Sequence, residues 1–342
     1  MAVLRFSDPD GAFAAVRLAS DVHLTDAQRT FTRAGGEWTL DVDLPDVLRL
    51  EYQLEVTRAD GGGTDHICDP GNPRRAPGAF GEKSVLELPG YHAPAWLDAP
   101  AVDGHIDESA VRGRGLGATV AIRVWSPADT EPGRPLRLLL ANDGPEYDAL
   151  ASLTRYCAAM IAADELPPFR VALLAPGDRD QWYSASAAYS RVLAHDIVPA
   201  LRDAYGVIGA PAGMGASLGA LAMLHAQRRF PRALGALLLQ SGSFFIPRYD
   251  AQERGFSRYA RIIRFVRETR RDGTYAMPVP TTITVGRAEE NAANNRAMAR
   301  ALAEQGYEVA FEEVADMHNY VGWRDALHPH LTALLRRAWR PR

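Results

Sequence analysis

The chain has 342 residues, enough for two domains or for one large domain with a substantial hydrophobic core. Its net charge of -4 and its scattered basic residues do not favour a nucleic-acid partner. Its apolar segments are too short to span a bilayer, so no membrane partner is expected. The N-terminal residues lack the charged region and apolar run of a signal peptide, which favours a cytoplasmic protein.

Residues 1–100 have the pattern of a small β-sandwich domain. The stretches 38–44 and 48–56 alternate apolar and polar side chains, as half-buried strands do. Clusters of Asp, Gly, Asn and Pro at 60–63 and 69–73 mark turns between strands. We expect this domain to position, cover or recognise a ligand rather than to catalyse a reaction.

The pattern changes after residue 100. The stretch 89–117 is rich in Pro, Gly, Ala and His, and residues 101–117 within it are assigned to a linker. Strands then alternate with helices over residues 118–342, which predicts an α/β domain with a mostly parallel sheet. The expected strands are 119–125, 135–141, 169–174, 236–239, 282–285 and 308–311, and the expected helices are 147–163, 186–204, 218–230, 291–305 and 323–338.

Gly215, Ser217 and Gly219 form a G-x-S-x-G motif, which in a strand-to-helix turn exposes one serine above a sheet. Glycines suit so sharp a turn because they adopt unusual backbone angles at little cost. The residues 209–212 before the motif are poor strand material. The motif alone also fits an ordinary helix entry of small residues, so it needs partners before it predicts chemistry.

Candidate partners follow later strands in the order that an α/β-hydrolase requires. Glu289 and Glu290 follow one expected strand directly, and His318 follows the next. His318 is the predicted base that takes the proton of Ser217, and a carboxylate would hold the imidazole in the right tautomer. We choose Glu289 as this carboxylate and keep Glu290 as the alternative, because the sequence does not say which side chain turns inward.

An oxyanion hole needs backbone N–H groups aimed at the developing charge. The amide of Leu218, which follows the nucleophile, is the first candidate. The second is expected from the loop after the strand 135–141, where Gly144 and Tyr147 are candidates and Pro145 has no N–H to offer. The alternative for this loop is an ordinary Asp-Gly-Pro turn.

Taken together, these motifs resemble those of the enterochelin esterase group within the esterase D-like α/β-hydrolases. The resemblance implies an α/β-hydrolase behind an immunoglobulin-like N-terminal domain, and hydrolysis of a carboxylic ester, such as a siderophore trilactone, through an acyl-enzyme. Related families cleave feruloyl esters or pass an acyl group to a sugar. The stretches that carry the resemblance are 69–73, 84–91, 142–144, 178–179, 215–219, 286–289 and 318–324.

Iron-loaded catechol siderophores are anionic, so Arg179 and Arg287 are candidate substrate-binding residues. Trp182 or Tyr183 is a candidate for stacking on a catechol ring. The alternative is that these residues are surface arginines and packed aromatics.

No cofactor and no metal are expected. A metal site would need two pairs of ligand residues at a suitable spacing, and the sequence offers no such second pair. Neither a dinucleotide-binding fingerprint nor a Walker loop is present. The predicted partner is a small-molecule ester. The alternative function is a binding protein, in which the β-sandwich recognises a ligand such as a glycan and the hydrolase domain is idle. The sequence does not indicate the oligomeric state.

Overall fold

The computed structural model describes residues 2–22, 24–78, 81–131, 133–275 and 277–340. The chain divides into two compact units. The first comprises Met1–His92 together with two later segments, Gly286–Glu290 and Val314–Gly322, and the second comprises the remaining chain. The N-terminal unit thus contains two segments that lie far along the chain, which the predicted domain boundaries did not anticipate.

The first unit contains two antiparallel sheets, with strand orders β1-β4-β3 and β2-β5-β8-β7, and β6 pairs with β5. Side chains from both sheets, such as Leu40 and Leu54, share one hydrophobic core. The elements are β1 (Ala2–Ser7), β2 (Phe13–Ser20), α1 (Asp26–Arg29), β3 (Thr32–Ala34), β4 (Glu37–Val42), β5 (Arg49–Arg58), β6 (Thr64–Ile67), β7 (Arg75–Ala76) and β8 (Lys83–Glu87).

The second unit contains an eight-stranded sheet of order β16-β15-β14-β13-β11-β12-β10-β9. The pairs from β12 through β11, β13 and β14 to β15 are parallel, whereas β10 and β9 join antiparallel. This confirms the predicted α/β fold with a mostly parallel sheet. The strands are β9 (Gly104–Gly113), β10 (Ala118–Pro127), β11 (Arg137–Asn142), β12 (Phe169–Leu174), β13 (Ala212–Ala216), β14 (Ala236–Gln240), β15 (Thr281–Gly286) and β16 (Val309–Val314).

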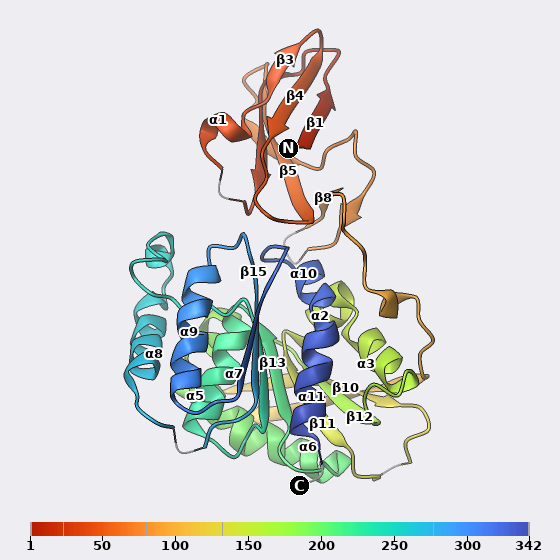
Figure 1. The fold of residues 1–342 in the computed structure, drawn as a ribbon, viewed down its shortest axis with the longest axis vertical. Helices are drawn as coiled ribbons and strands as arrows, with labels where there is room; N and C mark the ends of the chain where they lie inside the picture. Colours follow the sequence, from red (N-terminus) through yellow and green to blue (C-terminus); the bar gives the residue numbers. More distant parts are fainter. Residues whose placement is uncertain (1, 23, 79–80, 132, 276, 341–342) are drawn as a thin grey trace. The chain divides into compact units, whose positions relative to one another are not determined.

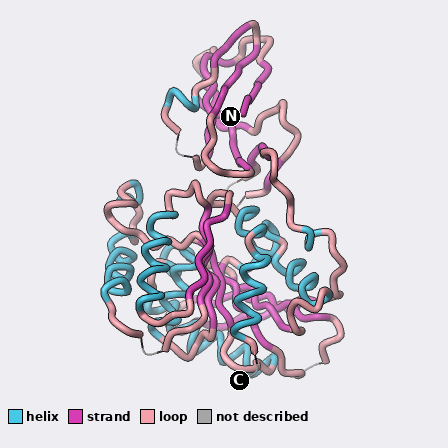
Figure 2. Tube along the Cα trace, in the orientation of Figure 1, coloured by secondary structure: helices cyan, strands magenta, loops and turns pink. Residues whose placement is uncertain are grey.

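Helices lie on both sides of this sheet, so strands β12 to β15 are buried along their whole length (Figure 2). Among the described residues, no helix is long and apolar enough to cross a membrane. The helices are η1 (Ala95–Leu97), α2 (Gly144–Ala151), α3 (Leu153–Ala162), α4 (Arg179–Tyr183), α5 (Ala187–Val192), η2 (Leu193–Ile197), α6 (Val198–Tyr205), α7 (Leu218–Arg229), η3 (Gln252–Gly255), α8 (Tyr259–Arg271), α9 (Ala292–Glu304), α10 (Tyr320–Asp325), η4 (Leu327–Leu331) and α11 (Thr332–Ala338).

Several elements differ from the sequence-based expectation. Most of the predicted linker forms β9, an edge strand whose half-exposed position explains its weak apolar pattern. The expected helix 147–163 is two helices, because Ser152 has a φ of +52° between α2 and α3. The helix α8 lies in a stretch where no element was expected.

The strand before Ser217 exists despite its unpromising composition. β13 is made of Ala, Gly and Met and lies between β11 and β14 in the middle of the sheet. Its small residues leave room for α7, which packs directly against it. Pro211 precedes the first residue of β13, where its missing N–H does not break the strand ladder.

Candidate active site

Ser217 forms a strained turn between β13 and α7. Its backbone has φ +56° and ψ −123°, a combination that side-chain-bearing residues rarely adopt and that costs about 1–3 kcal/mol. Gly215 must be glycine, because a Cβ there would lie 2.5 Å from the carbonyl carbon of Gly219. A Cβ at Gly219 would lie 3.1 Å from the carboxylate of Asp143. These contacts explain the G-x-S-x-G pattern physically.

Two helices begin beside this turn. Leu218 and Gly144 are the first residues of α7 and α2, which follow the parallel neighbours β13 and β11. Amides at the first position of a helix have no acceptor within that helix, so these two amides remain candidates for the predicted oxyanion donors. Tyr147 does not, because its amide donates to the carbonyl of Asp143 at 2.9 Å in the first turn of α2. That prediction was wrong.

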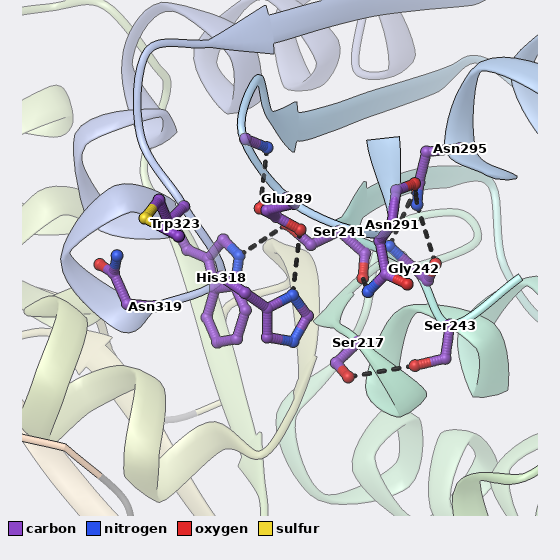
Figure 3. Close-up of polar contacts among 12 residues, drawn as sticks. Ser217, Ser241, Gly242, Ser243, Glu289, Asn291, Asn295, His318, Asn319 and Trp323 are labelled. Carbon is purple, nitrogen blue, oxygen red and sulfur yellow. Dashed lines mark hydrogen bonds and ion pairs between the residues drawn. The ribbon is translucent and has the colours of Figure 1, made fainter. Parts of the chain in front are cut away.

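The hydroxyl of Ser217 lies 3.1 Å from the hydroxyl of Ser243, which follows β14 (Figure 3). Asn295 of α9 fixes this second serine by bonding both backbone groups of Gly242. Its side-chain oxygen accepts from the Gly242 amide at 3.0 Å, and its amide group donates to the Gly242 carbonyl at 2.9 Å. The Ser243 amide also donates to the Ser217 carbonyl at 3.1 Å. Ser243 is therefore held rigidly beside Ser217, and the sequence analysis missed it.

A buried polar network supports the same loop. Ser241 has a φ of +48°, and its hydroxyl accepts a hydrogen bond of 2.9 Å from the indole nitrogen of Trp323. Gln240 donates to the carbonyl of Trp323 at 3.1 Å and accepts from the hydroxyl of Tyr147 at 2.9 Å. Tyr147 thus contributes its side chain rather than its amide.

Glu289 and His318 form a pair in the first unit. The imidazole Nδ1 lies 3.0 Å from one carboxylate oxygen of Glu289, and the amide of Gly286 donates to the other oxygen at 2.8 Å (Figure 3). Glu289 is buried, whereas Glu290 is exposed. Because an ionised carboxylate only accepts hydrogen bonds, Nδ1 carries the proton and Nε2 carries the lone pair of the neutral ring.

The pKa of His318 is raised above its ordinary value of 6.5. Burial lowers this pKa, but the negative charge of Glu289 and its hydrogen bond to the ring raise it by more. The pair therefore stabilises a positive charge on His318, which a base needs once it has accepted a proton.

The N-terminal domain anchors the loop that carries His318. The side chain of Met317 is buried in the same hydrophobic core as the strands of residues 1–92. The amide of Leu48 donates to the carbonyl of Ala315 at 2.9 Å. The packing of Met317 and the backbone hydrogen bond to Ala315 thus fix the chain just before His318.

The three predicted substrate-binding residues all make contacts with other side chains of the protein. Arg179 forms a bidentate ion pair with buried Asp143, with both N–O distances at 2.9 Å. Arg287 forms an ion pair with Asp46. Trp182 is only 6% exposed and belongs to the hydrophobic core. These contacts agree with the alternative of surface arginines, here ion-paired, and packed aromatics.

The parallel sheet, the strained serine turn and the paired histidine together define an α/β-hydrolase. The chain belongs to the "Putative esterase" family, whose match covers residues 113–334. It is also 23% identical over 243 residues to the Bacillus subtilis protein YjcH, covering 68% of this chain and 98% of that protein.

Solved structures share the fold. The enterobactin esterase FES from Shigella flexneri has a TM-score of 0.76 at 18% identity, over 99% of this chain and 94% of its own. The ferric enterobactin esterase from Salmonella typhimurium has a TM-score of 0.77 at 18% identity, over 98% and 93%. A feruloyl esterase module from Clostridium thermocellum has a TM-score of 0.54 at 12% identity, over 74% and 95%.

Proposed function

We propose that the protein is a serine esterase that hydrolyses a carboxylic ester through an acyl-enzyme. Ser217 attacks the ester carbonyl, Nε2 of His318 takes its proton and passes it to the departing alcohol, and Glu289 orients the imidazole. Water then repeats the sequence and releases the acid. The observation that carries this proposal is the strained backbone of Ser217, a conformation that costs free energy and that occurs mainly at functional sites.

The topology supports the assembly of these three residues. The strands β13 and β15, which precede Ser217 and Glu289, run parallel to β14 between them in one sheet. β16, which precedes His318, is the next strand after β15. Groups that follow the carboxyl ends of parallel strands gather at one edge of a sheet. The amides of Leu218 and Gly144 complete the proposal as donors to the oxyanion.

We propose a siderophore ester of the enterobactin type as the natural substrate. The support is the extent of the likeness, since the enterobactin esterases match 98% or more of this chain, including its N-terminal domain. The feruloyl esterase module matches 74%. At these identities the likeness shows the fold, so the substrate must be tested directly.

The test combines a covalent label with two substrates. Incubation with a fluorophosphonate is expected to modify Ser217, as read by mass spectrometry of the peptide that contains it, because an activated serine attacks phosphorus irreversibly. Ferric enterobactin and methyl ferulate are then compared as substrates by chromatography of the products. A kcat/KM for ferric enterobactin at least tenfold higher than that for methyl ferulate supports the siderophore substrate. A higher kcat/KM for methyl ferulate refutes it. Absence of both labelling and hydrolysis refutes the esterase.

Replacement of Ser243 by alanine is expected to lower kcat about three- to tenfold with little change in KM. The reason is that one neutral hydrogen bond to the nucleophile is worth about 0.5–1.5 kcal/mol. Steady-state kinetics on a p-nitrophenyl ester measures the effect. The matched control Ser243→Thr keeps the hydroxyl and should restore most of kcat. Equal rates for wild type and Ser243→Ala would show that the 3.1 Å contact does not assist the nucleophile.

A further inference from the structure

A pocket of about 320 Å³ lies between α8, α9 and the loop that contains Arg248. The helices α8 and α9 pack against each other in the second unit (Figure 1). None of the residues that line this pocket belongs to the proposed catalytic set. They are four arginines, one tyrosine, one glutamate and three alanines: Arg248, Arg270, Arg296, Arg300, Tyr249, Glu304, Ala293, Ala297 and Ala301.

We propose that this pocket binds a small organic phosphate monoester. The four guanidinium groups face only one carboxylate within the pocket, that of Glu304. Glu313 compensates one further charge through its ion pair with Arg296, where Nη2 and Oε2 are 2.9 Å apart. Together with the buried carboxylate of Asp250 behind the same wall, four positive and three negative side chains leave an excess of one positive charge. A phosphate monoester carries about −1.5 to −2 charges at neutral pH, opposite in sign to this excess.

Two of the arginines are available to a ligand. Within the described part of the chain, Arg270 and Arg300 have no hydrogen-bond or ion-pair partner, and both are exposed. They come from different helices, α8 and α9, and line the same pocket. Guanidinium groups match the oxygens of a phosphoryl group in a bidentate manner. Two guanidinium groups in one pocket can therefore hold one phosphoryl group together.

Hydrogen bonds hold the pocket wall that carries Arg248 in place before a ligand binds. Buried Asp250 accepts a hydrogen bond from the amide of Ile246 at 2.6 Å and another from Asn294 of α9 at 2.8 Å. Asn294 lies two residues before Arg296 on the same helix. The loop is thus tied to the helix that supplies the other wall, and less conformational entropy is lost when a ligand binds.

The remaining wall suits an organic group. The alanines at 293, 297 and 301 form an apolar strip along α9, and Tyr249 also lines the pocket. The volume falls at the lower end of the range of small-molecule sites, about 300–1,000 Å³. It leaves room for a phosphoryl group and a compact organic body.

Calorimetric titration of the full-length protein with phenyl phosphate tests the proposal. One saturable site is expected, with at least tenfold weaker binding in Arg270→Gln and in Arg300→Gln. Inorganic phosphate should bind more weakly than phenyl phosphate, because it makes no contact with the alanine strip. Arg264→Gln is the matched control, since Arg264 is an exposed arginine of α8 outside this pocket, and it should bind as tightly as wild type.

The result is independent of esterase activity, because Ser217→Ala should bind phenyl phosphate with unchanged affinity. Equal weakening in Arg264→Gln would show that only the general charge of α8 attracts the anion. Absence of saturable binding to wild type at low salt, or unchanged binding in both pocket variants, would also overturn the proposal.

Discussion

Replacement of Ser217 by alanine is expected to lower kcat for ester hydrolysis by at least about 10⁴-fold. In the proposed mechanism this hydroxyl forms the bond to the acyl group, so its removal abolishes the acyl-enzyme. The residual rate would come from the oxyanion donors and from substrate binding alone. Hydrolysis of a p-nitrophenyl ester by matched preparations of both proteins measures the difference.

This variant isolates the chemistry from the fold. Alanine has the same Cβ as serine, so the strain at φ +56° is retained and only the oxygen is removed. Its free energy of unfolding should stay within about 1 kcal/mol of wild type, because the lost hydroxyl bond to Ser243 is a neutral one. Hydrolysis within tenfold of the wild-type rate would refute Ser217 as the nucleophile.

Replacement of Glu289 by glutamine is expected to lower kcat by roughly 10³–10⁴-fold at neutral pH. Glutamine is similar in size, but its neutral amide does not stabilise the imidazolium that forms in the transition state. Glu290→Gln is the matched control, because Glu290 is the exposed neighbour, and its kcat should change less than about threefold. A large loss of kcat in Glu290→Gln and a small loss in Glu289→Gln would instead make Glu290 the carboxylate that orients His318.

The pH profile gives this comparison a second readout. A base must be unprotonated, so kcat/KM should rise with pH through the pKa of His318, which lies above 6.5 in the wild type. Removal of the Glu289 charge takes away the largest effect that raises this pKa while burial still lowers it, so the rising limb should shift to lower pH. An unchanged limb in Glu289→Gln would mean that the carboxylate does not act on the titrating base.

The parts of the site that could be predicted are those with local signals. Gly215 reflects a local contact, with Gly219 four residues on, whereas Gly219 reflects a close approach to Asp143, far away in the sequence. The choice between Glu289 and Glu290 depends on the conformation of the loop after β15, where the amide of Gly286 bonds one oxygen of Glu289. No pattern in the sequence encodes that bond.

The errors have similar causes. Tyr147 was a candidate donor because the expected helix began at this residue, but α2 begins at Gly144 and uses the Tyr147 amide. The stretch that ends in Ser243 resembles an ordinary turn. Its position directly after a buried strand was an available signal, whereas its partner Asn295 lies far along the chain. For α8, many arginines obscured the helical spacing of its apolar residues, Ile262 and Val266.

Because Met317 packs in the core of the N-terminal domain, this domain and the loop that carries His318 are expected to evolve together. Deletion of residues 1–92 would expose the Met317 side chain and remove the Leu48 hydrogen bond to Ala315, directly before the proposed base. A recombination event that exchanged only the first 92 residues between relatives would combine the N-terminal core of one protein with the segment 314–322 of another. Successful chimeras should therefore transfer the segment 314–322 together with the N-terminal domain.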